Sequence, residues 1–201
     1  MIYETAVVVR PDAGDDVLAK LKANIKDAIT STNGELLVED DWGVKTFAQP
    51  MEGGKTQGRY VYFMYKSNGQ GNTEIERRYR ISEEVMRFIV VNLGTDAEAE
   101  KIKKDYKNPN SRSADADRGR FDAEKEKKLF AKRSSCWFSA KKTQPDWKDP
   151  NTYSWLVNEF GKISPARVTG LRPKFQRSAT RAIKQARTMG LISFLSGQIA
   201  R

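Results

Sequence analysis

The sequence predicts an α+β protein in which an antiparallel sheet of β-α-β-β-α-β order is followed by a small, mainly helical, basic domain. Apolar runs alternate with turn residues through residues 1–95, whereas residues 96–135 are rich in Ala, Asp, Glu, Lys and Ser and poor in large apolar side chains. Aromatic and aliphatic periodicity returns in residues 136–201 on a basic background. We therefore expect two modest domains joined by a charged linker that is partly helical or disordered.

The first domain opens with a β-rich stretch at residues 3–9. Asp15 or Asp16 is expected to cap a helix whose apolar side chains step by three or four residues, and Asn33-Gly34 is expected to end it. The apolar stripe of this helix is Leu18, Leu21, Ile25 and Ile29. The beginning of the chain therefore predicts a strand and then an amphipathic helix.

Two strands, a second helix and a last strand complete the first domain. A Gly53-Gly54 turn separates the two middle strands, because paired glycines favour reversals of the chain. The expected elements are strands at residues 36–47, 59–66 and 85–93, and a short helix around Ile75 and Tyr79. This order is that of the ferredoxin-like fold, in which two helices cover one face of an antiparallel sheet.

The second face of this sheet is expected to be apolar as well, since large apolar side chains point in both directions along the third and fourth strands. Contiguous apolar patches are uncommon on soluble monomers, so this face predicts a docking surface, with tolerated surface aromatics as the alternative. A protein partner is favoured over nucleotide bases because the Gly-aromatic signature of RNA-stacking sheets is absent. The expected docking residues are Tyr60, Tyr62, Met64, Phe88 and Val90.

Charge is distributed unequally along the chain. Residues 1–105 hold 15 basic and 18 acidic side chains, whereas residues 106–201 hold 21 and 8. Residues 160–201 contain nine Lys and Arg and no acid. Such a concentrated positive field is typical of nucleic-acid binders, in which phosphate contacts dominate the affinity.

The basic domain predicts two helices. Asp149-Pro150 is a good helix start, and a stripe of Tyr153, Leu156, Val157 and Phe160 leads to a stop at Gly161. The last helix is expected at residues 173–190, and its cations fall on one side: Lys174, Arg177, Arg181, Lys184 and Arg187. Like charges at these spacings repel, so an anion is expected to relieve them. The opposite face is mostly alanine, too shallow for a membrane, which favours nucleic-acid phosphate.

Several function classes are disfavoured by composition. The chain has no histidine, the commonest general base and metal ligand, which argues against an enzyme. Its single cysteine, Cys136, can form neither an internal disulfide nor a four-ligand zinc site, so no metal and no cofactor are expected. Neither a membrane span nor a secretory signal is expected. An enzyme of the acylphosphatase type shares the first domain's topology, but no phosphate-cradling Gly-rich loop is evident.

The basic domain resembles bacterial small-subunit ribosomal protein number eighteen. The resemblance rests on Gly-Lys-Ile-Ser-Pro-Ala-Arg-Val-Thr-Gly at residues 161–170, on Gln176-Arg177 and on Arg-Ala-Ile-Lys at residues 181–184. Ser135-Cys136-Trp137-Phe138 is similar to the aromatic, cysteine-containing start of that family. Some members of the family hold zinc through several cysteines, which this chain lacks.

The first domain resembles bacterial small-subunit ribosomal protein number six. The matching positions are Tyr3-Glu4, Asn33-Gly34, Gly43, Gly58 and Arg80-Ile81 before Val85-Met86-Arg87. The two families bind each other and dock as a pair on the platform of the small subunit, against the central domain of its RNA. The resemblance therefore implies a tandem fusion that works as an intramolecular pair, and a linker of this length costs little closure entropy.

This resemblance implies a structural ribosomal protein of the bacterial cytoplasm that binds small-subunit rRNA and neighbouring ribosomal proteins, without DNA or membrane partners. A translational autoregulator that captures a messenger RNA mimicking the rRNA site is the alternative. The RNA contacts are expected from Lys141, Lys142, Arg167, Arg172, Lys174, Arg177, Arg181, Lys184 and Arg187. Arg78, Arg80 and Arg87 of the first domain form a second, lesser set.

Overall fold

The computed structural model describes residues 1–106, 108–109 and 136–195. The chain forms two compact units. Residues 1–46 and 52–108 make up the first, and residues 47–51 and 109–201 make up the second.

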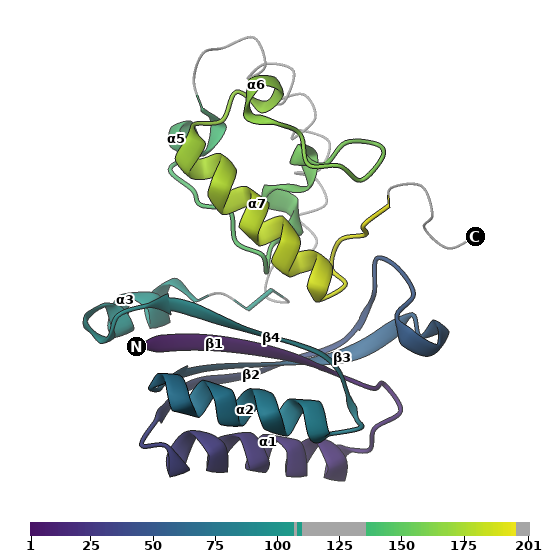
Figure 1. Cartoon of the computed structure of the whole chain (residues 1–201), viewed down its shortest axis with the longest axis vertical. Helices are drawn as coiled ribbons and strands as arrows, with labels where there is room; N and C mark the ends of the chain where they lie inside the picture. Colours follow the sequence, from purple (N-terminus) through teal and green to yellow (C-terminus); the bar gives the residue numbers. More distant parts are fainter. Residues whose placement is uncertain (107, 110–135, 196–201) are drawn as a thin grey trace. The chain divides into compact units, whose positions relative to one another are not determined.

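The first unit is an antiparallel sheet with two helices on one face (Figure 1). Its main elements are β1 (Ile2–Val9), α1 (Asp15–Ser31), β2 (Glu35–Thr46), β3 (Gln57–Lys66), α2 (Gly69–Ile81) and β4 (Val85–Gly94). The strands lie in the order β2-β3-β1-β4, and every neighbouring pair is antiparallel. This arrangement confirms the ferredoxin-like β-α-β-β-α-β prediction.

The ends of the two long helices follow local rules. Gly14, rather than an aspartate, occupies the N-cap position of α1, so the predicted Asp cap was wrong. Asp15 and Asp16 instead lie in the first turn, where a negative charge stabilises the helix N-terminus. Asn33 has a φ of 57° just after α1, in the left-handed region that stops a helix. In α2 the Asn68 side chain accepts the capping hydrogen bond from the backbone N–H of residue 71.

The core of the first unit lies between the sheet and the helices α1 and α2. Alternate side chains of β3, namely Val61, Phe63 and Tyr65, face the helices and are fully buried. Ile25 of α1 and Ile75 of α2 pack against them. Burial of an aliphatic or aromatic side chain stabilises the fold by about 1.5–3 kcal/mol, so this layer holds the helices on the sheet.

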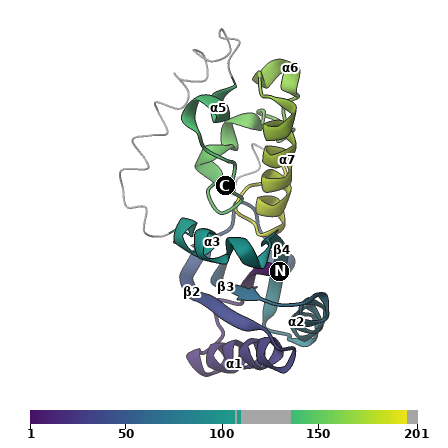
Figure 2. The same cartoon turned by 90° about the vertical axis from the view of Figure 1, so that its left-hand side faces the viewer.

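The opposite face of the sheet is not bare within the first unit. After β4 the chain forms η2 (Asp96–Glu98) and α3 (Ala99–Asp105), which Figure 2 shows on the other side of the sheet from α1. Tyr106 follows α3 and stacks on Tyr62 with 4.7 Å between the ring centroids. A helical segment was expected here as part of the linker. It packs instead with the first unit.

The second unit is built from short helical turns around one long helix. Its described elements are α5 (Trp137–Lys141), η3 (Pro150–Thr152), η4 (Ser154–Leu156), α6 (Ala166–Thr169) and α7 (Pro173–Thr188). Phe138 of α5 stacks on Phe175 of α7 with 5.7 Å between centroids, and Ala179, Ile183 and Ala186 of α7 are buried. The prediction of a long C-terminal helix is thereby confirmed.

The helix expected from Asp149-Pro150 to Gly161 does not form. Two 3-10 turns replace it, because Tyr153 adopts a non-helical conformation (φ −138°, ψ −2°) between them. The Tyr153 hydroxyl donates a 2.7 Å hydrogen bond to the Trp147 carbonyl, which holds the ring in the core. A β-bridge between Val157 and Ile163 then closes a loop. Tyr153 and Leu156 of the predicted apolar stripe are buried, but Phe160 is exposed, so the stripe was only partly right. Hydrogen bonds between residues six apart replace the helical pattern.

Residues 47–51, which follow β2 directly in sequence, lie in the second unit. The backbone N–H of Ala48 donates to the carbonyl of Gly190 at 2.8 Å. The Gln49 side-chain oxygen accepts from the Ser193 hydroxyl at 3.3 Å and from the Phe194 N–H at 3.2 Å. The bonds to the Gly190 carbonyl and the Phe194 N–H satisfy backbone groups that follow the C-terminus of α7.

Candidate nucleic-acid interface

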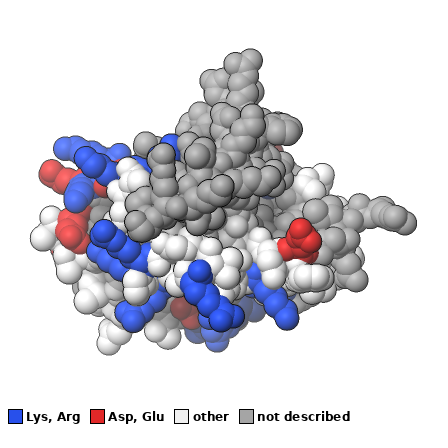
Figure 3. Space-filling model, turned by 90° about the horizontal axis from the view of Figure 1, so that it is seen from above, with Lys and Arg blue, Asp and Glu red and all other residues white. Residues whose placement is uncertain are grey.

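Helix α7 carries a row of exposed cations, which we call the cationic ridge: Lys174, Arg177, Arg181 and Lys184. Steps of three and four residues place these side chains on one face of the helix, over about 15 Å at 1.5 Å per residue. Pro173 occupies the first turn of α7, where its missing N–H costs nothing. Figure 3 shows Lys and Arg side chains along the left and lower parts of the view, with a few Asp and Glu among them.

The cationic ridge has no acidic counterpart in the described structure. Helix α7 contains no Asp or Glu. None of the four ridge side chains makes an ion pair or a side-chain hydrogen bond with the residues that the structure describes. Within the described part of the chain, the positive charge of the ridge therefore has no neutralising partner.

Further cations surround the beginning of α7. Arg172 is its N-cap residue, and Arg167 lies in the short helix α6 just before it; both are exposed. Lys141 ends α5 and Lys142 follows in a left-handed conformation (φ 51°), again with both side chains exposed. The Phe138–Phe175 stack joins α5 to the first turn of α7. The structure thus brings eight of the nine predicted basic residues onto the exposed surface of one unit.

Arg187 is the exception among those nine. Its guanidinium donates a hydrogen bond to the Gly161 carbonyl and lies 5.5 Å from the centre of the Phe194 ring. Burial lowers the pKa of Arg187. Arg187 stands about 60° around the helix axis from Lys184, so it lies at the edge of the stripe, where the neighbouring loop covers it. The structure therefore leaves this side chain half-buried against the neighbouring loop, apart from the cationic ridge.

Arg78 and Arg80, which were predicted to contact RNA, form contacts within the first unit. Arg78 donates to Glu74 at 2.8 Å and to the backbone carbonyl of Asn24, so it ties α2 to α1. Arg80 lies 3.4 Å from Glu76 on the same helix. Arg87 is exposed on β4, opposite Val8 and therefore on the sheet face away from α1 and α2.

The five predicted docking residues do not share one face of the sheet. Tyr60, Tyr62 and Met64 are buried on the face away from α1 and α2, where Trp42 stacks on Tyr62 with 5.2 Å between centroids. Phe88 instead packs against Tyr79 of α2, on the helix-covered face.

Val90 lies on the helix-covered face too, because its register partner Thr5 donates a hydrogen bond to the Tyr79 hydroxyl. The apolar residues of β4 that share the other face with Arg87 are Ile89 and Val91, opposite Ala6 and Glu4. The sequence showed the alternation in β4, but its register against β1 decides which set faces the helices.

A buried polar network lies on the same face as Tyr62, and sequence reasoning missed it. Glu4 is 1% exposed, and its carboxylate accepts a 2.8 Å hydrogen bond from the Tyr62 hydroxyl. Lys45 lies over the Trp42 ring at 5.2 Å, and burial lowers the pKa of Lys45. A glutamate in a β-rich segment gives no signal of its own, because its partner is 58 residues away.

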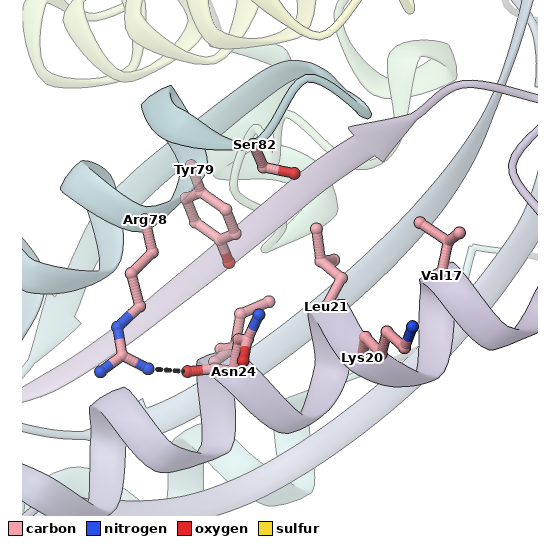
Figure 4. A pocket seen from close by; sticks show the side chains of 8 residues that line it. Val17, Lys20, Leu21, Asn24, Arg78, Tyr79 and Ser82 are labelled. Atoms are coloured by element: carbon pink, nitrogen blue, oxygen red, sulfur yellow. Dashed lines mark hydrogen bonds between the residues drawn. The ribbon is translucent and has the colours of Figure 1, made fainter.

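A shallow pocket of about 200 Å³ lies between α1 and α2 (Figure 4). Leu21, Ile25 and Tyr79 give it an apolar lining, and the hydrogen bond of Arg78 to Asn24 crosses one end. Lys20, Asn24 and Ser82 add polar groups to the lining.

Cys136 is buried at the start of α5. Burial raises the pKa of its thiol, but hydrogen bonds from the backbone of Arg172 and Ser139 outweigh that effect and lower it. Within the described ranges no three acidic, Cys or His side chains gather in a way that could hold a metal ion. No described helix combines the length and the apolarity needed to cross a membrane.

Comparison with known proteins identifies both halves of the chain. A family model described as Ribosomal protein S6 matches residues 2–92, and one described as Ribosomal protein S18 matches residues 141–192. The small ribosomal subunit protein bS6 of Geobacter metallireducens is 37% identical over 101 residues, which cover 50% of this chain and 85% of the relative.

The bS6 protein of Geobacter sulfurreducens is 39% identical over 98 residues, 49% of this chain and 83% of the relative. The solved structure of 30S ribosomal protein S6 from Thermotoga maritima is 23% identical with a TM-score of 0.45, and the match covers 52% of this chain and 97% of that one. The chain belongs to the ribosomal protein S6 family, with a ribosomal protein S18 sequence in tandem behind the S6 sequence.

Proposed function

We propose that this protein is a structural constituent of the small ribosomal subunit that binds the central domain of the small-subunit rRNA at the platform. The cationic ridge of α7 carries this proposal. Four exposed cations over about 15 Å match the spacing of a nucleic-acid backbone better than that of a single small anion, and phosphate contacts of this kind dominate RNA affinity. Arg supplies forked donors to phosphate oxygens, and Lys supplies a compact charge.

The flanking cations Lys141, Lys142, Arg167 and Arg172 extend this surface toward α5 and α6. Arg187 supports the surface indirectly, because it holds the loop of residues 157–163 against α7. The S6 and S18 matches support a ribosomal setting, and the proposed location is therefore with the ribosome in the cytoplasm. The proposed role is structural and needs no catalytic group.

The decisive experiment replaces Arg177, Arg181 and Lys184 together with Ala in the full chain. Binding to a transcript of the rRNA central domain is measured at several salt concentrations. Each lost phosphate contact should lower the slope of log affinity against log salt by about 0.7–0.9, so a slope reduced by about two to three units is expected. Replacing Lys101, Lys103 and Lys104 of α3 with Ala removes the same charge elsewhere and serves as the control. Equal losses in both variants would exclude the cationic ridge as the contact surface.

We further propose that the two halves work as an intramolecular pair. Residues 47–51, which continue directly from β2, belong to the second compact unit, and their hydrogen bonds to residues 190–194 support this proposal. The tether replaces a bimolecular assembly step with an intramolecular one at high effective concentration. A protease site placed in residues 110–135 of the full chain tests it. The cut halves should elute together in size-exclusion chromatography; separate elution of two folded halves would refute the pairing.

A further inference from the structure

The loop of residues 157–163 displays an aromatic side chain at its tip. Phe160 is 74% exposed, more than any other large apolar side chain in the described ranges. Single exposed apolar residues are ordinary on protein surfaces, so exposure alone assigns no role. Two further observations indicate a role for Phe160: the hydrogen bonds that fix the loop, and the position of the loop beside α7.

Hydrogen bonds fix the loop before any ligand arrives. The Asn158 side-chain oxygen accepts from the N–H of Phe160 at 3.1 Å and from that of Lys162 at 2.7 Å. The Asn158 N–H in turn donates to the Lys162 carbonyl at 2.8 Å. The backbone of Phe160 is therefore held in one conformation. When a ligand binds to the Phe160 ring, little further backbone entropy is lost, so little of the binding free energy is needed to offset that loss.

The loop is also fastened to α7. Gly161 has a φ of 77°, and a Cβ at this position would collide with the Phe194 carbonyl oxygen, so residues 161 and 194 approach closely. The Gly161 carbonyl accepts a hydrogen bond from Arg187, three residues beyond Lys184 of the cationic ridge. The exposed ring of Phe160 therefore lies near the C-terminal end of the ridge.

We propose that Phe160 stacks on an unpaired base of the RNA whose phosphates the cationic ridge neutralises. Every base offers a π-face, and proteins that bind RNA read splayed, unpaired bases by stacking them on aromatic rings. Glu159 and Lys162 give the loop no net charge, so the electrostatic attraction comes from α7 and the ring adds a contact of a different kind. This inference rests on the proposed function and adds a base-contacting residue to it.

The test compares Phe160→Ala and Phe160→Leu with Phe160→Tyr in the full chain. Both variants without an aromatic ring should bind the central-domain transcript at least about fivefold more weakly, the lower end of the measured range for one stacked base. The Tyr variant should bind as the unchanged protein does, because it keeps the ring. Val168→Ala, at an exposed apolar position in α6, is the matched control and should stay within about twofold of the unchanged protein.

Two further readouts separate stacking from other effects. The salt slope should be the same for Phe160→Ala as for the unchanged protein, because no phosphate contact is lost. Affinity for a fully paired RNA duplex of equal length should not change. A Phe160→Ala affinity within twofold, a reduced slope, or an equal loss on the duplex would each overturn the inference. Failure of the cationic-ridge triple variant to weaken binding would instead overturn the proposed function.

Discussion

The ring of Tyr106 lies almost parallel to that of Tyr62, with 4.7 Å between their centroids and 11° between their planes. The Tyr106 hydroxyl donates to Asp40 at 2.7 Å and accepts from the Trp42 indole N–H at 3.0 Å. Burial raises the pKa of Tyr106, so it stays neutral and can donate. One side chain after α3 thus joins β2 to β3 across the sheet face that α1 and α2 leave uncovered.

Replacing Tyr106 should therefore destabilise the first unit. Tyr106→Ala removes the stack and both hydrogen bonds, and we expect the free energy of unfolding to fall by about 2–4 kcal/mol, since a fully buried aromatic costs about 3–5. Tyr106→Phe keeps the ring and should cost about 1 kcal/mol per hydrogen bond lost. Urea denaturation followed by circular dichroism measures both. An Ala variant as stable as the Phe variant would contradict the role of the stack.

Gly161 and Gly170 both have a positive φ, but they should respond differently to substitution. Gly170 ends α6 with a φ of 68°, and no atom lies within 4 Å of the place a Cβ would take, so Gly170→Ala should cost only the left-handed strain of about 1 kcal/mol. Gly161→Ala meets the Phe194 carbonyl as well and should cost clearly more. Thermal melting of the two variants makes the comparison. Equal melting temperatures would show that residues 161 and 194 do not approach closely.

Substitution of Arg187 should lower stability, whereas substitution of Arg177 should weaken RNA binding. Arg187→Ala loses the hydrogen bond to Gly161 and the contact with the Phe194 ring, so we expect a lower melting temperature and an unchanged salt slope. Arg177→Ala should leave the melting temperature unchanged and lower the slope by about one. Melting curves and binding isotherms on both variants decide this. If Arg187→Ala lowered the slope of log affinity against log salt without lowering the melting temperature, Arg187 would be an RNA-contacting residue after all.

The pH dependence of stability should reveal the Glu74 ion pairs. Hydrogen bonds from Arg77 and Arg78 lower the pKa of Glu74 to about 2, from an ordinary value of 4.5. Because the folded pKa lies below the unfolded one, this contribution is fully present above pH 4.5 and is lost as the pH falls from 4.5 to 2. The stability gap between the unchanged protein and Glu74→Gln should close over that window.

NMR titration of the Glu74 carboxyl checks the same assignment directly. Arg77→Ala removes the larger of the two causes and should raise the pKa of Glu74 toward its ordinary value. A carboxyl that titrates near 4.5 in the unchanged protein would show that these pairs do not form in solution.

Local patterns determined much of the first unit. The β-rich apolar runs, the three- and four-residue steps of α1, and the turn at Asn33 act over a few neighbouring residues, so the sequence predicts the element order and the helix-covered sheet. The same local spacing predicts the exposed row of cations on α7. The sequence also predicts the tandem of two ribosomal protein families, because the motifs of each family lie within one continuous segment of the chain.

Tertiary structure alone decided which partners meet. The register of β4 against β1 places Phe88 and Val90 on the face that α1 and α2 cover. Tyr106 packs on the sheet face that was expected to be open. The loop after Asn158 binds Arg187, which therefore lies apart from the cationic ridge. Tyr153 broke an expected helix through its bond to Trp147. Each outcome depends on a contact between residues outside one periodic segment, and spacing within a segment carries no information about such contacts.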